Sequence, residues 1–450
     1  MKNFYLIIKL LLDVIIEKKL PPTFSSRTLF IIPSTVIIGL YSICPNIKLL
    51  DDYKLKYEHV TNLKLCKKQI NLIIIYLSNK ALELLNNDLD SQLIKKYLDG
   101  NNFQIDFIEP KILQNIVYEM VYYYNQRNKD GWKDSNKQIK LVNDNYITVN
   151  IPINPNNFNN IDSWCPLEGQ KMLGSQWGKV KSILSQKQID KINKFLEHEY
   201  AHVDIKLECK EVLDKSLVLT DKEKMIAEFW AGIGGSVTPP GFFNMFLYGY
   251  FIANFRSNIT QLKYFYKLNT GLFQASIIVW DVKYKYLQCR PIQSIRLEYP
   301  RIPIDYYFGQ TTTDLWKPYQ ESRLLTPPFP DYISGHSTFS STASNILTRL
   351  LGPTLCNLHI KLNKEEMLML SPIFSSMDIK CMDLTEIIIK PDSSKIQSNV
   401  PNEYVGLQFE TWEDMAESAG VSRIYGGIHY PSSNKIGFQV GQMISDNLFL

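Results

Sequence analysis

Residues 326–337 read Thr-Pro-Pro-Phe-Pro-Asp-Tyr-Ile-Ser-Gly-His-Ser, and the fold is best predicted from this stretch. Its prolines exclude a helix before Ser334, because proline lacks the N–H that a helix interior needs. Residues 337–343 then lead into a helix predicted to end at Leu351. Ser334 to Ser337 are therefore predicted at a helix amino end, where free backbone N–H groups and the positive end of the helix dipole favour an anion.

Two residues of this stretch add chemistry to the predicted helix end. Gly335 would let the backbone approach a bound anion closely. His336 can exchange a proton with a bound oxygen, because an imidazole titrates near neutral pH. A Ser-Gly-His tripeptide alone is weak evidence, since such tripeptides also arise by chance at helix caps. Further motifs in the sequence are needed to support an anion site at this helix end.

Two further segments supply fixed positive charge and a second histidine. Lys283 stands seven residues before Arg290, and one helix ended by Pro291 would place both cations on the same face. Arg423 stands six residues before His429, close enough in a folded turn to share a ligand with it. Arginine offers a planar fork of donors to anionic oxygens, and lysine offers a point charge. The three segments together predict a pocket for a tetrahedral oxyanion, of the phosphate or vanadate kind, beside an acid–base pair.

The order and spacing of these segments resemble the three-part signature of the phosphatidic acid phosphatase type 2 / vanadium haloperoxidase superfamily. The segments are Lys283-(six residues)-Arg290-Pro291, Ser334-Gly335-His336 and Ser422-Arg423-(five residues)-His429. Within the superfamily, residues 163–450 are most similar to the vanadium-dependent haloperoxidase branch, and further support comes from residues 177–180, 227–232, 238–241 and 327–340. The resemblance implies a mainly α protein built as a helical bundle.

The resemblance also implies a role for each motif residue. His429 would bind the central atom, which is vanadium in the peroxidases and phosphorus in the phosphatases. The residues implied to hold the oxygens are Lys283, Arg290, Ser334, Gly335 and Arg423. His336 would be the general acid–base, and Phe329 matches an aromatic position that lines the vanadate pocket of chloroperoxidase-like members.

Two reactions follow from the resemblance. A haloperoxidase would use vanadate as its cofactor and oxidise halide with hydrogen peroxide, which His336 helps to deprotonate. A phosphatase would use His429 as the nucleophile and His336 as the acid that protonates the leaving alcohol. The phosphatase pattern places an aspartate four residues after the ligand histidine, but this chain has Ser433 there. Because a serine cannot stabilise an imidazolium as a carboxylate does, a catalytically degenerate anion-binding protein is a third possibility.

A competing motif lies upstream. His198, Glu199 and His202 spell His-Glu-x-x-His on a predicted helix, which is the spacing of a zinc metalloprotease. Glu223 or Glu228 could supply a third ligand. The charged residues around the motif are more typical of a solvated helix face, so this remains the lesser alternative.

The composition limits the class of partner and the location. Lys and Arg number 49 against 45 Asp and Glu, giving a net charge of +4, and without a dense basic run this argues against nucleic acid. Seven scattered cysteines without a Cys-x-x-Cys pair fit reduced thiols. The apolar residues 4–16 and 29–44 are predicted as buried helices, because the first run carries charges and the second is too short for a comfortable span. We expect a cytoplasmic or otherwise soluble protein that acts on small molecules and has no membrane span.

The organisation along the chain is predicted from composition and periodicity. Residues 1–142 are an amino-terminal helical region packing on the core, residues 143–162 an Asn- and Pro-rich linker, and residues 163–450 the catalytic domain, with an insert at about 357–411. The clearer helices are predicted at residues 66–87, 111–124, 186–201, 221–231, 244–255, 272–286, 336–351 and 435–448. Strand alternation is scarce, which favours a mainly α architecture.

Overall fold

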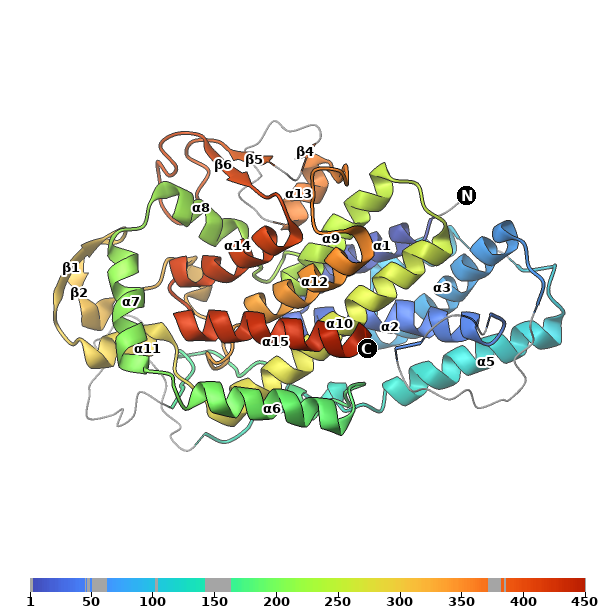
Figure 1. The fold of residues 1–450 in the computed structure, drawn as a ribbon, viewed down its shortest axis with the longest axis horizontal. Helices are drawn as coiled ribbons and strands as arrows, with labels where there is room; N and C mark the ends of the chain where they lie inside the picture. Colours follow the sequence, from blue (N-terminus) through green and yellow to red (C-terminus); the bar gives the residue numbers. More distant parts are fainter. Residues whose placement is uncertain are drawn as a thin grey trace.

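The computed structural model describes residues 3–44, 46, 49–50, 63–101, 104–141, 163–370, 382–383 and 386–449. The predicted mainly α fold is confirmed: long helices lie side by side along the molecule, with only short strand pairs at its edges (Figure 1). The linker predicted at residues 143–162 lies outside the described residues, and the division into domains remains a prediction.

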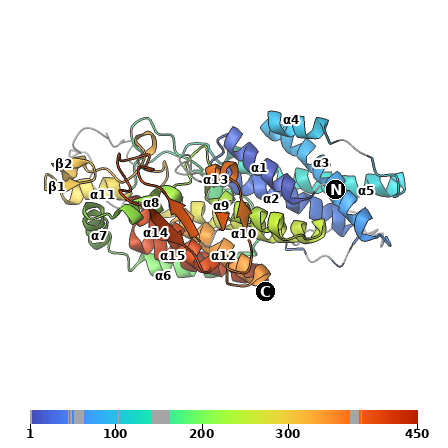
Figure 2. The ribbon, with the colours of Figure 1, turned by 90° about the horizontal axis from the view of Figure 1, so that it is seen from above.

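The amino-terminal helices gather at one end of the long axis (Figure 2). They are α1 (Tyr5–Glu17), α2 (Pro22–Tyr41), α3 (Lys67–Leu89), α4 (Gln92–Asp99) and α5 (Pro110–Arg127). Among the described residues, α2 is the one helix long and apolar enough to cross a membrane, but 94% of its apolar stretch is buried inside the protein. This burial is what the core helix of a compact bundle requires, and α2 does not indicate a membrane span.

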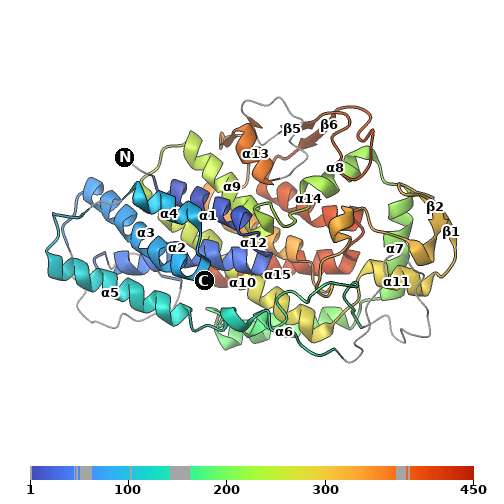
Figure 3. The same ribbon diagram turned by 180° about the vertical axis from the view of Figure 1, so that it is seen from behind.

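The remaining helices form the larger part of the bundle. They are α6 (Gln186–Tyr200), α7 (Ile205–Leu217), α8 (Asp221–Phe229), α9 (Thr238–Ala253), α10 (Asn258–Tyr286), α11 (Pro291–Glu298), α12 (Gly335–Leu351), α13 (Lys364–Leu370), α14 (Trp412–Tyr425) and α15 (Pro431–Phe449). Figure 3 shows α10, α12, α14 and α15 packed together in the middle of the molecule, next to the amino-terminal helices. Short 3₁₀ turns occur at Trp132–Asp134, Trp177–Lys179, Thr313–Leu315 and Ser322–Leu324.

Helices α9 and α10 start well before the positions that the sequence predicts, and α15 starts four residues before its predicted position. Helix α9 begins at Thr238 and α10 at Asn258, before the predicted starts at residues 244 and 272. Pro239 and Pro240 occupy the first turn of α9, where a missing N–H costs nothing, so they begin the helix instead of breaking it. Helix α10 is buried on nearly all sides and includes buried polar residues, which hides its apolar periodicity.

The contact of α12 with α15 depends on small residues. A Cβ at Gly437 would lie 2.9 Å from the carbonyl oxygen of Ser334, and a Cβ at Gly441 would lie 2.7 Å from that of Thr338. Both distances are too short for carbon and oxygen atoms in a packed interior. Glycine therefore lets α15 lie directly against the first turns of α12. This close approach brings the segment just before α15 to the Ser-Gly-His motif.

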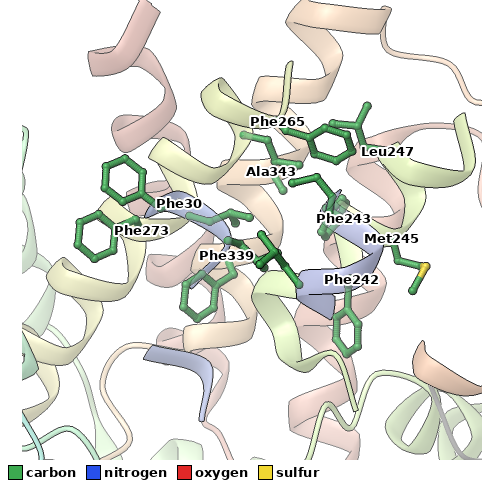
Figure 4. Close-up of a cluster of buried hydrophobic side chains, with 14 of the residues drawn as sticks. Phe30, Phe242, Phe243, Met245, Leu247, Phe265, Phe273, Phe339 and Ala343 are labelled. Atoms are coloured by element: carbon green, nitrogen blue, oxygen red, sulfur yellow. The ribbon is translucent and has the colours of Figure 1, made fainter. Parts of the chain in front are cut away.

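Helix α12 also packs against a core rich in aromatic side chains (Figure 4). Phe30 of α2 stacks on Phe273 of α10 with ring centroids 4.6 Å apart. Phe339 and Ala343, one and two turns into α12, are buried in this core. Burial of a side chain the size of phenylalanine stabilises a fold by about 2–3 kcal/mol. The amino end of α12 is thus held in place by the core below it.

The short strands lie outside the helical core. Strand β1 (Pro303–Tyr306) pairs antiparallel with β2 (Gly309–Thr312), β3 (Lys361–Leu362) with β4 (Met382–Asp383), and β5 (Glu386–Ile389) with β6 (Val405–Gln408). The insert predicted at about 357–411 contains α13 and the last four of these strands. Ile387 and Ile389 point one face of β5 into the core, so the described part of the insert packs on the bundle.

Candidate active site

The predicted site residues come from five helix ends. Lys283 lies in the last turn of α10, Arg290 just before α11, Ser334 just before α12, Arg423 in the last turn of α14 and His429 two residues before α15. Gly335 and His336 begin α12. All are buried except His336, which is half-buried. Ser334 caps α12 as predicted, because its Oγ accepts a hydrogen bond from the backbone N–H of Ser337 at 3.3 Å.

One prediction about the cations is wrong. Helix α10 ends at Tyr286, where Leu287 takes a left-handed conformation (φ 51°), so Lys283 and Arg290 do not share a helix face. Pro291 begins α11 instead of ending a helix, because its fixed φ suits a first helical position. A tight turn, not helical periodicity, brings the two cations together.

Arg290 is the most connected of the three cations. Its Nε donates to the carbonyl oxygen of Phe329 at 2.9 Å, and its Nη1 donates to that of Ile428 at 2.7 Å. Nη1 also lies 3.1 Å from Nε2 of His429. Nη2 is buried and has no hydrogen-bond partner in the described structure. The guanidinium thus keeps one buried donor available for a ligand.

The other two cations are held by backbone carbonyl groups. Nζ of Lys283 donates to the carbonyl oxygens of Pro330 and Asp331, at 2.9 and 2.6 Å. Nη2 of Arg423 donates to that of Ala227 at 2.6 Å. Burial lowers the pKa of Arg423 to about 9, and burial together with Arg290 holds the pKa of Lys283 well below its ordinary value. Each cation is therefore fixed in place without a neutralising partner of its own.

Phe329 lies beside two of these cations. Nζ of Lys283 is 5.2 Å from the centre of its ring, and the guanidinium carbon of Arg290 is 5.0 Å away. An aromatic face attracts cations at such distances. The ring is half-buried and also packs on Trp280, so it forms a wall of the cationic pocket.

Gly335 meets only ordinary contacts: a Cβ there would lie 3.7 Å from Trp280, so within the protein itself no clash requires glycine.

His336 is held by a backbone carbonyl group at the end of α8. Its Nε2 lies 2.9 Å from the carbonyl oxygen of Trp230. Because a carbonyl oxygen only accepts, Nε2 carries the hydrogen and Nδ1 carries the lone pair. Burial, the charge of Arg423 and the nearby His429 hold the pKa of His336 well below its ordinary value. The imidazole is therefore a neutral base at physiological pH.

Asp331, which the sequence analysis did not select, lies against His429. Its Oδ1 is 2.7 Å from Nδ1 of His429 and 3.5 Å from Nη1 of Arg290. Its side chain is fully buried, which raises its pKa to about 6. Ser433, at the position where the phosphatase pattern has an aspartate, has its hydroxyl 3.4 Å from the same Nδ1. Asp331 is an acidic residue inside the proline-rich stretch 326–333. That stretch predicted only the absence of a helix, so this carboxylate was not among the predicted site residues.

The charges in the pocket favour an anion. Lys283, Arg290 and Arg423 are 0–1% exposed, and within the described residues their ion pairs are limited to Arg290 with Asp331. Burying an uncompensated cation is costly, so an anion that enters would restore favourable charge pairing. The unpartnered Nη2 of Arg290 and the amino end of α12 add donors. These residues fit an oxyanion of the vanadate or phosphate kind.

Comparisons with known proteins identify the fold that carries these residues. Residues 263–450 match the family described as the VCPO second helical-bundle domain. The crystal structure of a bacterial vanadium-dependent iodoperoxidase has a TM-score of 0.66 at 17% identity, covering 100% of this chain and 96% of that one. Residues 263–450 thus match a haloperoxidase family model, and the whole chain has the vanadium haloperoxidase fold.

Two structures of bacterial vanadium-dependent chloroperoxidase resemble this haloperoxidase-like protein as well. The apo form has a TM-score of 0.65 at 15% identity, with 96% of this chain and 95% of that one covered. The holo form has a TM-score of 0.62 at 14% identity, with 96% and 93% covered. At these identities the likeness establishes the fold. No curated protein matches the chain in sequence.

The His-Glu-x-x-His motif does not form a metal centre in the described part of this haloperoxidase-like protein. His198 and His202 are exposed, at the end of α6, and Nδ1 of His202 lies 2.7 Å from the carbonyl oxygen of His198. Glu223 pairs with Lys215. Among the described residues, no three His, Cys, Asp or Glu side chains are placed to hold a metal ion together. The proposed third ligands therefore do not converge on the two histidines.

Glu228 has a different role in the haloperoxidase-like fold. Its buried carboxylate accepts hydrogen bonds from the Tyr319 hydroxyl at 2.8 Å, the Ser394 hydroxyl at 2.5 Å and the Lys395 backbone N–H at 2.7 Å. It thereby ties the insert to α8, whose Ala227 carbonyl holds Arg423. The insert is thus connected to the site through one buried carboxylate.

Two neighbouring cavities lie near the contact between Glu228 and the insert. A cavity of about 630 Å³ is lined by Phe308, Lys317, Glu321 and Ile396, among others. A gap of only about 10 Å³, about the size of one water molecule, shares Glu321 and Ile396 with it and reaches Ala231. A Cβ at Gly232, the next residue, would lie 3.3 Å from Nε2 of His336. The larger volume suits a small organic ligand beside the site.

Proposed function

We propose that this protein is a vanadate-dependent haloperoxidase that oxidises halide with hydrogen peroxide at a vanadate held by His429. The observation that carries the proposal is the convergence of three buried cations on two histidines, one of which faces an arginine with a free donor. The haloperoxidase fold adds support. The net reaction converts halide, hydrogen peroxide and a proton into hypohalous acid and water, with two electrons passing from halide to peroxide.

The pocket residues would bind and orient the oxyanion. Bound vanadate would supply the activation of hydrogen peroxide toward halide. Lys283, Arg290 and Arg423 would hold its oxygens, together with the Ser334 hydroxyl and the Gly335 N–H. Nε2 of His429 is the nitrogen that faces the cations, at 3.1 Å from Arg290. In a buried site these fixed charges stabilise anionic oxygen more strongly than they would in water, because the local dielectric constant is low.

His336 would act as the base of the peroxidase reaction. Its pKa is held well below the ordinary value, so the ring is neutral and Nδ1 can accept a proton from hydrogen peroxide. A phosphatase would need a protonated His336 to give a proton to the leaving alcohol. The paired assays below, and not the pKa of the empty pocket, decide between the two roles of this ring.

Paired assays test the proposal. Protein loaded with orthovanadate is assayed for peroxide-dependent halogenation of monochlorodimedone with bromide and with chloride, and for oxidation of iodide to triiodide. Vanadate-free protein is assayed for p-nitrophenyl phosphate hydrolysis. The variants are His429→Ala and His336→Ala, and the matched control is His202→Ala, because His202 is exposed on the surface.

The outcomes separate the three candidate functions. Halide oxidation that requires vanadate, disappears in both site variants and persists in His202→Ala is the expected result. Ester hydrolysis that vanadate inhibits, without halide oxidation, would make the protein a phosphatase. Vanadate binding without either activity would indicate a degenerate anion-binding protein.

A further inference from the structure

We propose that Asp331 is the positioning residue for His429: its carboxylate holds the hydrogen of the imidazole on Nδ1, so that Nε2 presents its lone pair to the oxyanion. This role goes beyond the resemblance, which places an orienting carboxylate at position 433, where this chain has serine. It rests on the proposed function only in taking His429 as the residue that binds the oxyanion.

The backbone of Asp331 is fixed independently of His429. Its N–H donates to the carbonyl oxygen of Gln288 at 2.9 Å. Its carbonyl oxygen accepts from Nζ of Lys283 at 2.6 Å and from the Ser433 hydroxyl at 3.3 Å. Residue 331 therefore connects the three motif segments, and its side chain starts from an anchored point. A carboxylate held in this way can orient a ring without first being ordered by it.

The carboxylate is aimed at the imidazole. Its Oδ1 lies 2.7 Å from Nδ1 of His429, and the nearest cation is Nη1 of Arg290 at 3.5 Å. The Ser433 hydroxyl and the Tyr430 backbone N–H lie close enough to the carboxylate to lower its pKa, but in the described structure neither makes a well-formed hydrogen bond to its oxygens. The side chains are 0% and 3% exposed, so water does not compete for either group. The Nδ1 hydrogen of His429 is thus the donor that this buried acceptor requires.

An ionised carboxylate selects one tautomer, and a hydroxyl does not. Carboxylate oxygens only accept hydrogen bonds, so a neutral imidazole beside them keeps its hydrogen on Nδ1. The Ser433 hydroxyl, 3.4 Å from Nδ1, can either donate or accept, so it would tolerate both tautomers. Asp331 therefore supplies what Ser433 cannot. The lone pair then lies on Nε2, the nitrogen that faces Arg290.

Nitrogen NMR measures this tautomer directly. The protein, without vanadate, is labelled with ¹⁵N-histidine, and His429 is assigned by comparison with His429→Ala. We expect a protonated Nδ1 and an unprotonated Nε2 in the wild type. Asp331→Asn should give a mixture of tautomers, because an amide can turn to present either an acceptor or a donor. Asp314→Asn is the matched control, since Asp314 is also buried but lies outside the motif segments, and it should leave the His429 signals unchanged.

A second measurement is the affinity for vanadate, in variants that remove the carboxylate of Asp331 or move it to position 433. Isothermal titration with orthovanadate should show about a 10- to 100-fold loss of affinity in Asp331→Asn and Asp331→Ala, the usual effect of removing a group that orients a ligand. Ser433→Asp combined with Asp331→Ala should recover part of the affinity and the Nδ1-protonated form, because position 433 already reaches Nδ1.

The outcomes distinguish this proposal from the proposed function. A wild-type His429 protonated on Nε2 would overturn the positioning role whatever the enzyme's activity. So would an Asp331→Asn variant with wild-type tautomer and wild-type affinity. The expected tautomer and affinity changes, in a protein that oxidises no halide, would leave the role of Asp331 intact and remove only the peroxidase assignment. Because the wild-type spectrum and the near-isosteric Asn variant decide the question, it does not depend on whether Asp331→Ala folds.

Discussion

Nη1 of Arg290 lies 3.1 Å from Nε2 of His429 inside the buried pocket. The cation that would hold an oxyanion thus faces the nitrogen that would bind it, and both sit against Asp331. A negatively charged ligand that reaches Nε2 also reaches the guanidinium. We therefore expect Arg290 and His429 to act as a unit, so that their substitutions are not additive.

Replacement of Arg290 tests whether its guanidinium binds the oxyanion. Arg290→Ala should lower vanadate affinity by about 100-fold or more, since charge-assisted hydrogen bonds to a buried anion contribute about 1.5–3 kcal/mol each. Arg290→Lys should recover only part of this, because lysine lacks the planar fork. Titration with vanadate measures both, with exposed Arg323→Ala as the control. Equal affinities of Arg290→Ala and wild type would mean that the anion binds elsewhere.

Anion binding should stabilise the fold. Among the described residues, the three buried cations form one ion pair, that of Arg290 with Asp331, so the empty pocket is costly. An oxyanion present at 100 times its Kd adds about 2.7 kcal/mol to the free energy of unfolding. We expect orthovanadate, and phosphate at higher concentration, to raise the Tm by a few degrees. Thermal unfolding of wild type and Lys283→Met with and without vanadate checks this. A shift of the same size in Lys283→Met would argue against the pocket.

Glu208 should make stability depend on pH. Burial raises its pKa from 4.5 to about 7 in the folded protein, and it accepts a hydrogen bond from the Ser432 hydroxyl at 2.7 Å. The folded state thus holds this proton more tightly than the unfolded chain. The stabilisation is complete below pH 4.5 and is lost as the pH rises through 7. The full shift corresponds to about 3 kcal/mol at most.

Glu208→Gln removes this titration. The variant should gain stability relative to the wild type as the pH rises from 5 to 8, measured by urea unfolding at several pH values. Exposed Glu413→Gln is the control, because its carboxylate lies on the surface. A stability difference between Glu208→Gln and wild type that is the same at every pH would contradict the prediction.

The α12–α15 contact should be sensitive to a single methyl group. Alanine normally stabilises a helix interior by about 1 kcal/mol relative to glycine. At Gly441, however, its Cβ would lie 2.7 Å from Ser341 Cβ and Thr338 O. We therefore expect Gly441→Ala to lower the free energy of unfolding by about 1–3 kcal/mol and to weaken vanadate binding. Gly406→Ala is the control, since a Cβ there meets nothing within 4 Å. An unchanged Tm in Gly441→Ala would show that the helices separate easily.

Ile396 tests whether an organic substrate uses the cavity that this residue lines with Phe308 and Lys317. Ile396→Trp would fill part of the roughly 630 Å³ space without touching the oxyanion pocket. We expect a higher KM for monochlorodimedone and unchanged oxidation of iodide to triiodide. Tyr404→Trp, at an exposed position of the same insert, is the control. An unchanged KM in Ile396→Trp would mean that the organic substrate reacts outside this cavity.

Much of the candidate site was predicted from the sequence because its signals are local. Prolines before Ser334 and a helix pattern after it predicted a capped amino end, and the structure has that cap. Three cations and two histidines at the spacing of a known signature predicted the oxyanion pocket, and the structure brings them together. The helix starts at Thr238 and Pro291 were misjudged, because proline breaks a helix interior but favours a first turn.

The sequence by itself determined the helical character of the chain, the helix amino end at Ser334 and the set of charged and imidazole groups available for an anion. Only the tertiary structure decided that Asp331, and not a residue beside Ser433, is the carboxylate at His429. It also decided that Glu228 ties down the insert and does not bind a metal with His198. The physical reason is that caps and turns depend on neighbouring residues, whereas these contacts join residues far apart in the chain, Asp331 with His429 and Glu228 with Ser394, which only the packing of the helices brings together.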